Sequence, residues 1–384
     1  MIQPSEKSNL VSYPIRDIVL EAKALERKGT KMIYLNIGDP APFGFRPPKH
    51  ILDAATDAMN HNYSGYAPSE GDPELRQEAA KYEGVDSGDV FISSGLSEGI
   101  EFLYTAMVNP GDNILLPVPA YPLYITKQKL YGGEPVFCKS DENFIPDMDD
   151  MLKSITPSTK AILVINPNNP TGMIYPRKIL EEIVNLAGEF NLPLIGDDAY
   201  EKIVLDGEYT NLRKIHKDVP LVSGNSLSKN YIYPGARVGY IAFHGQGWDK
   251  IKDAIQRLCN QRLSVNWEMQ RAYIAALRGS DDHITVFNKE LRKRRDVLVK
   301  RVSEIDGLSV PMPKGAFYAL IKVEKQAWKS DWDFVRELLK EGVVAVPGSG
   351  FGPLDGLYFR VAYFPGEEQL NDAFSKIENV LKRH

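Results

Sequence analysis

The sequence predicts an α/β protein with two parts, a large domain built on a mainly parallel seven-stranded sheet and a smaller α+β domain. The chain has 384 residues, and chains longer than about 300 residues usually divide into more than one domain. Between residues 88 and 245, short apolar runs alternate with longer helix-like stretches, which is typical of parallel strands joined by helices. Beyond residue 280 this alternation ends. We therefore expect a large domain of residues 46–280 and a small domain of residues 1–45 and 281–384.

The predicted elements follow in order along the chain. The sequence predicts a helix at residues 16–28 and a strand at residues 32–37. Since neither element has a place in the parallel sheet, we assign both to the small domain. The strands predicted for the large sheet span residues 90–93, 113–117, 134–138, 161–165, 192–196, 221–224 and 238–243. Residues 248–278 predict one or two amphipathic helices, and residues 281–306 predict a long charged helix. Short strands around 315–322 and 343–346 and a last helix from residue 367 complete the small domain.

The composition of the chain indicates which class of ligand the protein binds. The chain has 46 Lys and Arg against 51 Asp and Glu, a formal charge of -5, which argues against nucleic acid or anionic lipid and favours a small-molecule ligand. The first residues lack the apolar core of a signal peptide, and no run is long enough to span a membrane, so we expect a cytoplasmic protein. Cys138 and Cys259 show no metal-ligand spacing, and we expect them to pack in the core, with no metal site.

Functional residues are expected beyond the carboxyl ends of the strands, where ligands bind in open α/β sheets. The segment Ser226-Leu-Ser-Lys-Asn230 places Lys229 at such an end. A lysine in a polar loop is by itself no more than a surface charge, so its neighbours decide its meaning. Arg237 follows in the turn Pro234-Gly-Ala-Arg-Val-Gly239, and its planar guanidinium suits a phosphate, although a plain turn arginine would look the same.

Two other strand ends carry groups that can orient a ligand. Ile165-Asn-Pro-Asn-Asn-Pro-Thr-Gly172 frames asparagines with prolines, which fix the backbone and so can hold the amide of Asn169 in one orientation. Gly196-Asp-Asp-Ala-Tyr200 supplies a carboxylate at Asp197 and a phenol at Tyr200. An aspartate at a strand end is also a common helix N-cap.

Two earlier segments add an anion site and an aromatic residue. Phe91-Ile-Ser-Ser-Gly-Leu-Ser-Glu-Gly99 is a strand, a small-residue turn and a helix start, which presents free backbone N–H groups to an anion but lacks the ending of a P-loop. Pro117-Val-Pro-Ala-Tyr-Pro122 sets Tyr121 between prolines, and packing explains this tyrosine as well as a functional role does.

Together these residues provide the parts that pyridoxal phosphate (PLP) requires: an amine, a carboxylate, hydroxyl and amide donors, an anion cradle and an aromatic cover. The sequence resembles the fold type I PLP enzymes and is similar to class I and II aminotransferases from about Tyr34 to Phe364. The order of four motifs carries this resemblance: Asn169-Pro-Thr-Gly, then Asp197 with Tyr200, then Ser226-x-Ser-Lys229, then Arg237-x-Gly.

The resemblance implies the chemical roles of four residues. Lys229 matches the lysine that holds the cofactor as a Schiff base and acts as the base in the proton shift, which requires a lowered amine pKa. Asp197 matches the carboxylate that keeps the ring nitrogen protonated. Asn169 and Tyr200 match the donors to the phenolic oxygen of the cofactor.

The resemblance also implies the binding residues. Gly95, Leu96 and Ser97 bind the phosphate together with Ser226 and Arg237, and Tyr121 stacks on the ring. In the segment Leu357-Tyr-Phe-Arg-Val-Ala-Tyr-Phe364, Arg360 matches the clamp for the substrate α-carboxylate, although an arginine in an alternating strand would otherwise face solvent. Gly38 and Asn169 lie near that carboxylate. Tyr66, in Tyr63-Ser-Gly-Tyr-Ala-Pro68, matches the tyrosine that reaches the phosphate of the neighbouring subunit, which implies a homodimer with shared active sites.

The activity expected from this resemblance is amino transfer between an L-amino acid and a 2-oxo acid by a ping-pong mechanism. A β-elimination lyase shares the same lysine, aspartate and arginine and is the alternative enzyme. A PLP-fold transcriptional regulator would need a DNA-binding domain, and only about 30 residues precede the expected fold.

Two N-terminal segments indicate which substrate to expect. Residues 12–17 and 35–45 resemble the alanine aminotransferase branch, which uses pyruvate and glutamate, while aspartate and aromatic donors stay as alternatives. Arg262 is a candidate for reading a side-chain carboxylate, because it lies roughly where dicarboxylate-specific relatives carry a second arginine from the partner subunit, although its flanking register differs.

Overall fold

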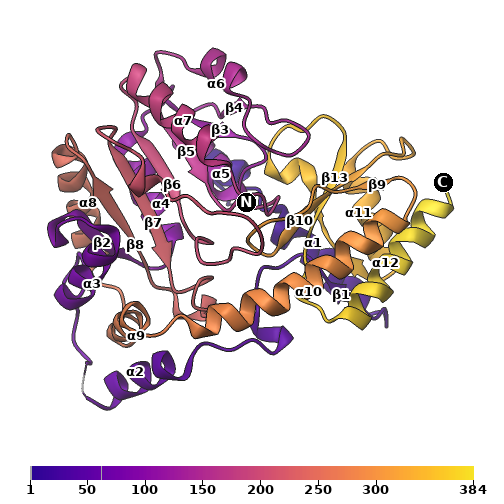
Figure 1. Cartoon of the computed structure of the whole chain (residues 1–384), viewed down its shortest axis with the longest axis horizontal. Coiled ribbons are helices and arrows are strands. Elements are labelled where there is room, and N and C mark those ends of the chain that lie inside the picture. Colours follow the sequence, from indigo (N-terminus) through magenta and orange to yellow (C-terminus); the bar gives the residue numbers. More distant parts are fainter. Residues whose placement is uncertain (1, 62) are drawn as a thin grey trace.

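A seven-stranded sheet forms the centre of the larger part of the molecule in the computed structural model, which describes residues 2–61 and 63–384 (Figure 1). The strands are ordered β2-β8-β7-β6-β5-β3-β4. Their bounds are β2 (Val90–Ser93), β3 (Asn113–Pro117), β4 (Val136–Cys138), β5 (Thr159–Ile165), β6 (Leu194–Asp197), β7 (Leu221–Ser226) and β8 (Gly239–His244). The predicted fold class, a mainly parallel seven-stranded sheet with a smaller α+β part, is confirmed.

One strand runs against the others. Strands β4, β3, β5, β6 and β7 are mutually parallel, whereas β8 is antiparallel to both of its neighbours, β7 and β2. The alternation of strands and helices had suggested a parallel strand here as well. A parallel connection usually needs a crossover helix, and the segment between β7 and β8 contains only a short 3-10 helix, Pro234–Ala236, so the chain turns back.

Helices cover both faces of this sheet, which explains why its strands are apolar on both sides. On β5, Leu163 packs toward one face, and Ile162 and Val164 pack toward the other. One face carries α4 (Leu96–Met107), α5 (Pro122–Leu130) and α8 (Asp249–Arg262). The other face carries α6 (Met148–Ser154) and α7 (Arg177–Glu189), with α3 (Pro73–Glu83) and α9 (Trp267–Arg278) over the end formed by β2 and β8. Helix α2 (Lys49–Asn60) packs on α9.

The smaller part has an antiparallel sheet in the order β12-β13-β10-β9 and a separate pair formed by β1 and β11. The strands are β1 (Ile33–Tyr34), β9 (Leu308–Ser309), β10 (Tyr318–Val323), β11 (Val343–Val344), β12 (Val346–Pro347) and β13 (Leu357–Ala362). The helices are α1 (Pro14–Glu26), α10 (Asp282–Glu304), α11 (Asp331–Lys340) and α12 (Glu367–Lys382). Because β1 pairs with β11, the N-terminal segment lies beside C-terminal strands, and on this basis we keep domain boundaries near residues 45 and 280 as a proposal.

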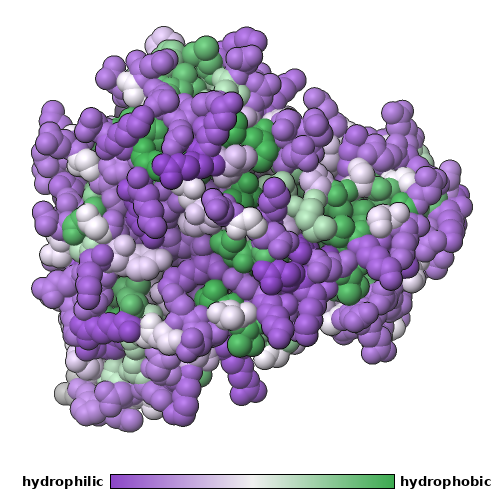
Figure 2. All heavy atoms as spheres, viewed as in Figure 1, coloured by the Kyte–Doolittle hydropathy of each residue, from purple (hydrophilic) through white to green (hydrophobic). Residues whose placement is uncertain are grey.

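Most large apolar side chains of the described residues are buried in the cores of the two parts. Cys138 and Cys259 are buried and unpaired in two of the apolar clusters, where they pack as small hydrophobic residues. Figure 2 shows hydrophobic side chains in small separate groups on one face, surrounded by hydrophilic ones. Within residues 2–61 and 63–384, no helix is both long enough and apolar enough to cross a membrane.

Candidate active site

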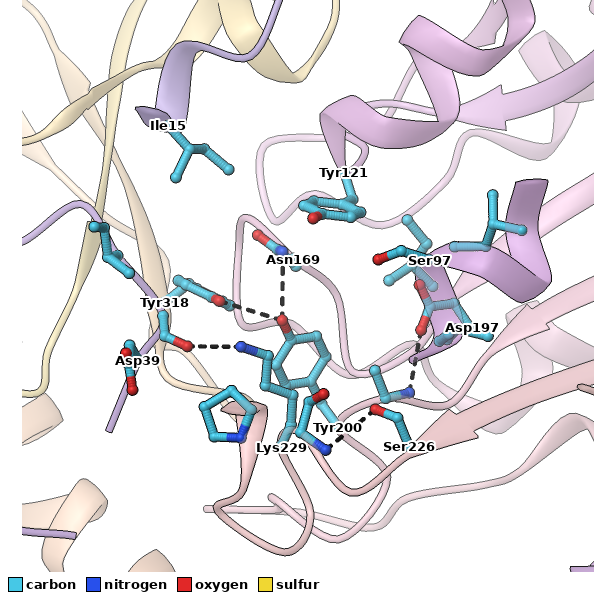
Figure 3. A pocket seen from close by; sticks show the side chains of 18 of the residues that line it. Ile15, Asp39, Ser97, Tyr121, Asn169, Asp197, Tyr200, Ser226, Lys229 and Tyr318 are labelled. Carbon is cyan, nitrogen blue, oxygen red and sulfur yellow. Dashed lines mark hydrogen bonds between the residues drawn. The ribbon is translucent and has the colours of Figure 1, made fainter. Parts of the chain in front are cut away.

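A cavity of about 450 Å³ opens beyond the carboxyl ends of β5, β6 and β7, where the large sheet meets the smaller part (Figure 3). It is the place that the topology of an open α/β sheet predicts. The structure brings together most of the predicted site residues around it: Gly38, Leu96, Ser97, Tyr121, Asn169, Asp197, Tyr200, Ser226, Lys229, Arg237 and Arg360.

Lys229 projects into the cavity from the loop that follows β7. Its Nζ atom donates a hydrogen bond to the carbonyl oxygen of Gly38 at 2.6 Å, and a Cβ atom at Gly38 would collide with the hydroxyl of Tyr318. Burial lowers the pKa of Lys229 to about 8. The negative charge of Asp39 opposes this decrease, and the positive charges of nearby arginines add to it. The amine can therefore be neutral or charged near neutral pH, as a nucleophile and a proton carrier must be.

Asp197 is the last residue of β6, and its carboxylate lines the cavity. It accepts hydrogen bonds from the hydroxyl of Tyr124 at 2.9 Å and from the backbone N–H of Ala199 at 3.1 Å. Burial raises the pKa of Asp197 to about 6, and these two hydrogen bonds oppose the rise. The carboxylate is thus mostly ionised at neutral pH, which suits it to hold a proton on a ligand nitrogen.

Asp198 points away from the cavity into a set of charged side chains that we call the buried ionic cluster: Glu83, Asp198, Glu201 and Arg213. Since successive residues of a strand point in opposite directions, the two adjacent aspartates have different neighbours. Asp198 is therefore not available to a ligand in the cavity, and Asp197 is.

Arg360, on β13, is buried with 1% exposure and does not face solvent. One guanidinium nitrogen donates to Oδ1 of Asn169 at 3.0 Å, and another donates to the carbonyl oxygen of Asn36. The group lies 4.4 Å from the ring centre of Tyr318 and 5.0 Å from that of Phe351. Its Nε atom has no hydrogen-bond partner among the described residues. A buried cation with an unfilled donor in the wall of a cavity suits a carboxylate ligand.

An anion cradle lies at the N-terminus of α4. Gly95 precedes this 12-residue helix with φ of +72°, and the guanidinium of Arg237 lies so close that a Cβ atom at Gly95 would come within 2.4 Å of it. Arg237 is held by the carbonyl oxygen of Pro234 at 3.0 Å and by the hydroxyl of Ser228 at 3.4 Å. A helix N-terminus beside an arginine suits a phosphate.

Tyr121 and Tyr66 differ in their placement. The hydroxyl of Tyr121 hydrogen-bonds to that of Tyr13 at 2.7 Å, and the ring of Tyr121 borders the cavity above Asn169 in the view of Figure 3. Tyr66 is 81% exposed and does not line the cavity of its own chain. A role toward a neighbouring subunit stays a prediction.

Arg262 does not line the cavity of its own chain either. Its guanidinium donates to the carboxylate of Glu98 at 2.5 Å and to the carbonyl oxygens of Ser69 at 2.7 Å and Ile92 at 3.2 Å. All three hydrogen bonds are made within the same chain, which favours a structural role over the recognition of a substrate.

Several cavity residues were not among the predicted ones. Tyr318 hydrogen-bonds to Tyr200 at 3.2 Å between the hydroxyl oxygens, and Ile15, Arg16 and Asp39 add walls from the N-terminal segment. Tyr124 follows Tyr121 by three residues in a helix started by a proline, so helical spacing alone could have suggested it. No local pattern indicates Tyr318, because its partners are distant in sequence.

These groups fit PLP. The amine of Lys229, the carboxylate of Asp197, the donors at Asn169 and Tyr200 and the cradle at Arg237 supply the complete donor set that this cofactor needs. Any larger residue at position 95 would displace Arg237, so the glycine there leaves the cradle open.

Known proteins give the same picture. A family model described as aminotransferase class I and II matches residues 30–377. The glutamate-pyruvate aminotransferase AlaA of Haemophilus influenzae is 35% identical over 396 residues, covering 98% of this chain and 97% of its own. The alanine aminotransferase of Mycobacterium tuberculosis is 34% identical over 395 residues, covering 98% and 92%. The solved structure of an alanine aminotransferase from Pyrococcus furiosus superposes with a TM-score of 0.96 at 41% identity and covers all of both chains.

Proposed function

The chain belongs to the class I and II aminotransferase family, and from that premise we propose that it moves an amino group between alanine and glutamate, with pyruvate and 2-oxoglutarate as the oxo acids. It is a PLP-dependent transferase. The observation that carries the choice of substrates is the full-length similarity to relatives named glutamate-pyruvate and alanine aminotransferases.

The size and charge of the cavity support this choice. A volume of about 450 Å³ is at the low end for ligand sites, and it has to hold the cofactor and the substrate together, which favours a small amino acid. Arg16 is a further cation in the wall, and it is exposed. We assign it to the second carboxylate of glutamate, which alanine lacks.

Arg360 serves both halves of a ping-pong cycle. Amino acids and 2-oxo acids share a carboxylate next to the reacting carbon, so one bidentate arginine can orient both. Its Nε atom is the donor left unfilled among the described residues, and Gly38 and Asn169 border the same place. Burial of Arg360 between two aromatic rings excludes water from the ion pair.

Lys229 and Asp197 are proposed to handle the protons. When bound, PLP supplies an electron sink for the bonds at the substrate α-carbon. The amine of Lys229, with a pKa of about 8, would take the proton from that carbon and return it to the carbon on the other side of the transferred nitrogen. The carboxylate of Asp197 holds the proton on the ring nitrogen, and Tyr124 fixes the orientation of that carboxylate.

The remaining predicted residues are assigned to binding. Gly95, Leu96 and Ser97 hold the phosphate with Ser226 and Arg237, Tyr121 covers the ring, and Asn169 and Tyr200 donate to its phenolic oxygen. We further propose a homodimer in which Tyr66 reaches the phosphate in the neighbouring subunit, since 81% exposure leaves it accessible. A cytoplasmic location is proposed from the composition.

A panel of amino donors tests the substrates. Alanine, glutamate, aspartate and phenylalanine are each offered with pyruvate or 2-oxoglutarate, and the new amino acid is measured by chromatography. We expect alanine with 2-oxoglutarate and glutamate with pyruvate to be the best pairs. A preference for aspartate or aromatic donors with little alanine turnover would reject the proposed substrates while leaving the amino-transfer chemistry intact. Pyruvate and ammonia released from a β-substituted alanine would instead favour the elimination lyase.

The assignment of Lys229 has its own test. Borohydride should remove the visible absorption and fix the cofactor covalently, and peptide mass spectrometry should place the adduct on Lys229. An adduct on another lysine would contradict the assignment without affecting the substrate panel.

A further inference from the structure

Tyr318, on β10, stands out among the cavity residues that no motif indicated. It is 3% exposed, lines the cavity and places its hydroxyl oxygen 3.2 Å from that of Tyr200 (Figure 3). It comes from the smaller part of the molecule, whereas Tyr200 follows β6 of the large sheet. The hydrogen bond therefore joins the two parts directly at the site.

The surroundings of Tyr318 hold its hydroxyl in one place. A Cβ atom at Gly38 would come within 1.9 Å of that hydroxyl oxygen, and one at Gly172 would come within 2.4 Å of the Tyr318 carbonyl oxygen. Two glycines thus give the side chain and its backbone room on both sides. The guanidinium of Arg360 covers one face of the ring at 4.4 Å, and the ring of Tyr200 meets it edge-on at 5.7 Å.

The hydrogen bonds around Tyr200 determine where its proton points. A phenol oxygen accepts up to two hydrogen bonds and donates one. The amide nitrogen of Asn169 can only donate, and it lies 3.5 Å from the Tyr200 oxygen. If the hydroxyl of Tyr318 also donates, both acceptor positions on that oxygen are filled, and the O–H bond of Tyr200 must point elsewhere, into the cavity.

The hydrogen-bond partners of Tyr318 favour that direction. Tyr200 is the one hydrogen-bond partner of the Tyr318 hydroxyl among the described residues, so the Tyr200 oxygen is the acceptor open to it. The charged and titratable groups around the pair are Arg360 from β13, Asp197 from β6, Lys229 from the loop after β7, Tyr121 from the start of α5 and Tyr13 from the start of α1. Burial raises the pKa of both phenols, so both stay protonated and able to donate near neutral pH.

We propose that Tyr318 is a positioning residue whose hydroxyl donates to Tyr200 and thereby directs the Tyr200 O–H bond toward the phenolic oxygen of the cofactor. The inference rests on the proposed role of Tyr200. A stronger donor at the phenolic oxygen offsets its negative charge and weakens its hold on the proton carried by the Lys229 nitrogen. Tyr318 therefore influences the protonation of the bound cofactor through Tyr200.

Titration of the visible absorption of the holoenzyme tests this role independently of turnover. In Tyr318→Phe the ring and its contact with Arg360 remain, and only the hydroxyl is lost. We expect the pH midpoint of the absorption change to rise by about half to one unit, the size that one hydrogen bond supports. Tyr200→Phe should raise the midpoint further. Tyr363→Phe is the matched control, because that buried hydroxyl donates to the carbonyl oxygen of Ala316 and does not line the cavity, so its midpoint should stay unchanged.

The double variant separates positioning from direct action. In the Tyr200→Phe background, Tyr318→Phe should add no further shift, because its effect passes through Tyr200. An additional shift of full size, or an unchanged midpoint in the single Tyr318→Phe variant, would overturn the inference. An unchanged midpoint in Tyr200→Phe would instead reject the proposed role of Tyr200. As a second substitution that keeps the fold, 3-fluorotyrosine at position 318 makes the hydroxyl more acidic and should lower the midpoint, and a rise there would also contradict the proposal.

Discussion

The cavity and the buried ionic cluster meet at the end of β6, and they use polar side chains in opposite ways. Asp197 lines the cavity, and its neighbour Asp198 belongs to the cluster. In the cluster, Arg213 lies 2.9 Å from a carboxylate oxygen of Glu201 and 3.4 Å from one of Glu83. One guanidinium there is shared by three carboxyl groups, those of Glu83, Asp198 and Glu201.

Neutral hydroxyl groups also donate hydrogen bonds to the buried ionic cluster. Glu83 accepts hydrogen bonds from Tyr240 at 2.6 Å and from Ser223 at 2.8 Å. Burial, together with repulsion from Glu201, raises the pKa of Asp198 well above its usual value, so this carboxyl is suited to remain protonated. Oδ2 of Asp198 has no hydrogen-bond partner among the described residues, but Arg213 lies 3.7 Å from it and Asp198 does not line the cavity. Nε of Arg360 also lacks a partner within the described part of the chain, and Arg360 lines the cavity. The difference teaches that buried charge alone does not mark a site, and that unfilled hydrogen-bonding capacity facing a cavity does.

The two aspartates give the sharpest test of this comparison. Asp197→Asn should retain the cofactor but lose at least about a thousandfold in kcat, because a neutral amide cannot hold the ring proton. Asp198→Asn replaces a carboxyl already suited to be neutral, and we expect less than about a tenfold change. Steady-state kinetics on both variants measure the effects. Equal losses would remove the distinction between the two regions.

Removing the cation of the cluster should affect stability and leave binding nearly intact. Arg213→Met leaves buried carboxylates without a counter-charge, and the free energy of unfolding should fall by about 3–5 kcal/mol. Denaturant unfolding of the holoenzyme measures this change. The KM values of the folded variant should stay within about twofold of the wild type, a difference of under 0.5 kcal/mol. A variant of wild-type stability would show that the cluster carries no net stabilisation.

Substitution of Arg360 should have the opposite effect, a loss of substrate binding and turnover. Arg360→Lys loses the bidentate geometry, and kcat/KM should fall by about tenfold to a hundredfold for alanine, glutamate and both oxo acids alike, because all share the same carboxylate. Arg262→Met is the matched control. Its donors are held by Glu98, Ser69 and Ile92, so any loss should be small and equal for acidic and neutral substrates. A loss in the Arg262 variant that is confined to glutamate and aspartate would restore its role as a reader of side-chain carboxylates.

The smallest expected effect concerns pH. Only the neutral amine of Lys229 can attack the cofactor, and its pKa of about 8 is lower than that of an ordinary lysine. The rate at which cofactor-free enzyme captures PLP should rise about fivefold from pH 7 to pH 8 and less than about twofold from pH 8 to pH 9. Stopped-flow absorbance measures the rate. A rise that continues steeply beyond pH 9 would mean that the lysine is not desolvated in solution.

Much of the large sheet was predictable from the sequence because parallel strands buried on both faces appear as continuous apolar runs between turns. The strands at 90–93 and 113–117 match the structure in full, and the others agree within a few residues. The direction of β8 was not predictable from its own residues, because direction depends on what connects it to β7. Lys229, Asp197 and Asn169 were predictable because strand ends place them at one edge.

The rest of the site depends on contacts that no local pattern encodes. Tyr318 meets Tyr200 across 118 residues of sequence, and it looks like any strand tyrosine. Glu83 ends a polar helix, so its charge resembles a solvated helix face until the fold brings Arg213 beside it. The contacts of Arg262 were not predictable for the same reason, since its partners Glu98 and Ser69 lie more than 160 residues away in the sequence.

The pairing of β1 with β11 has a consequence for the order in which the protein matures on the ribosome. Ile33 pairs with Val343, which is made 310 residues later (343 minus 33). At about 5–20 residues per second this delay is roughly 15–60 s. During that time the apolar face of α1, with Ile18 and Ala22, has no place to dock. In a nascent chain α1 therefore waits for α11, β11 and β12, the elements that it contacts, much longer than neighbouring strands of the central sheet wait for one another.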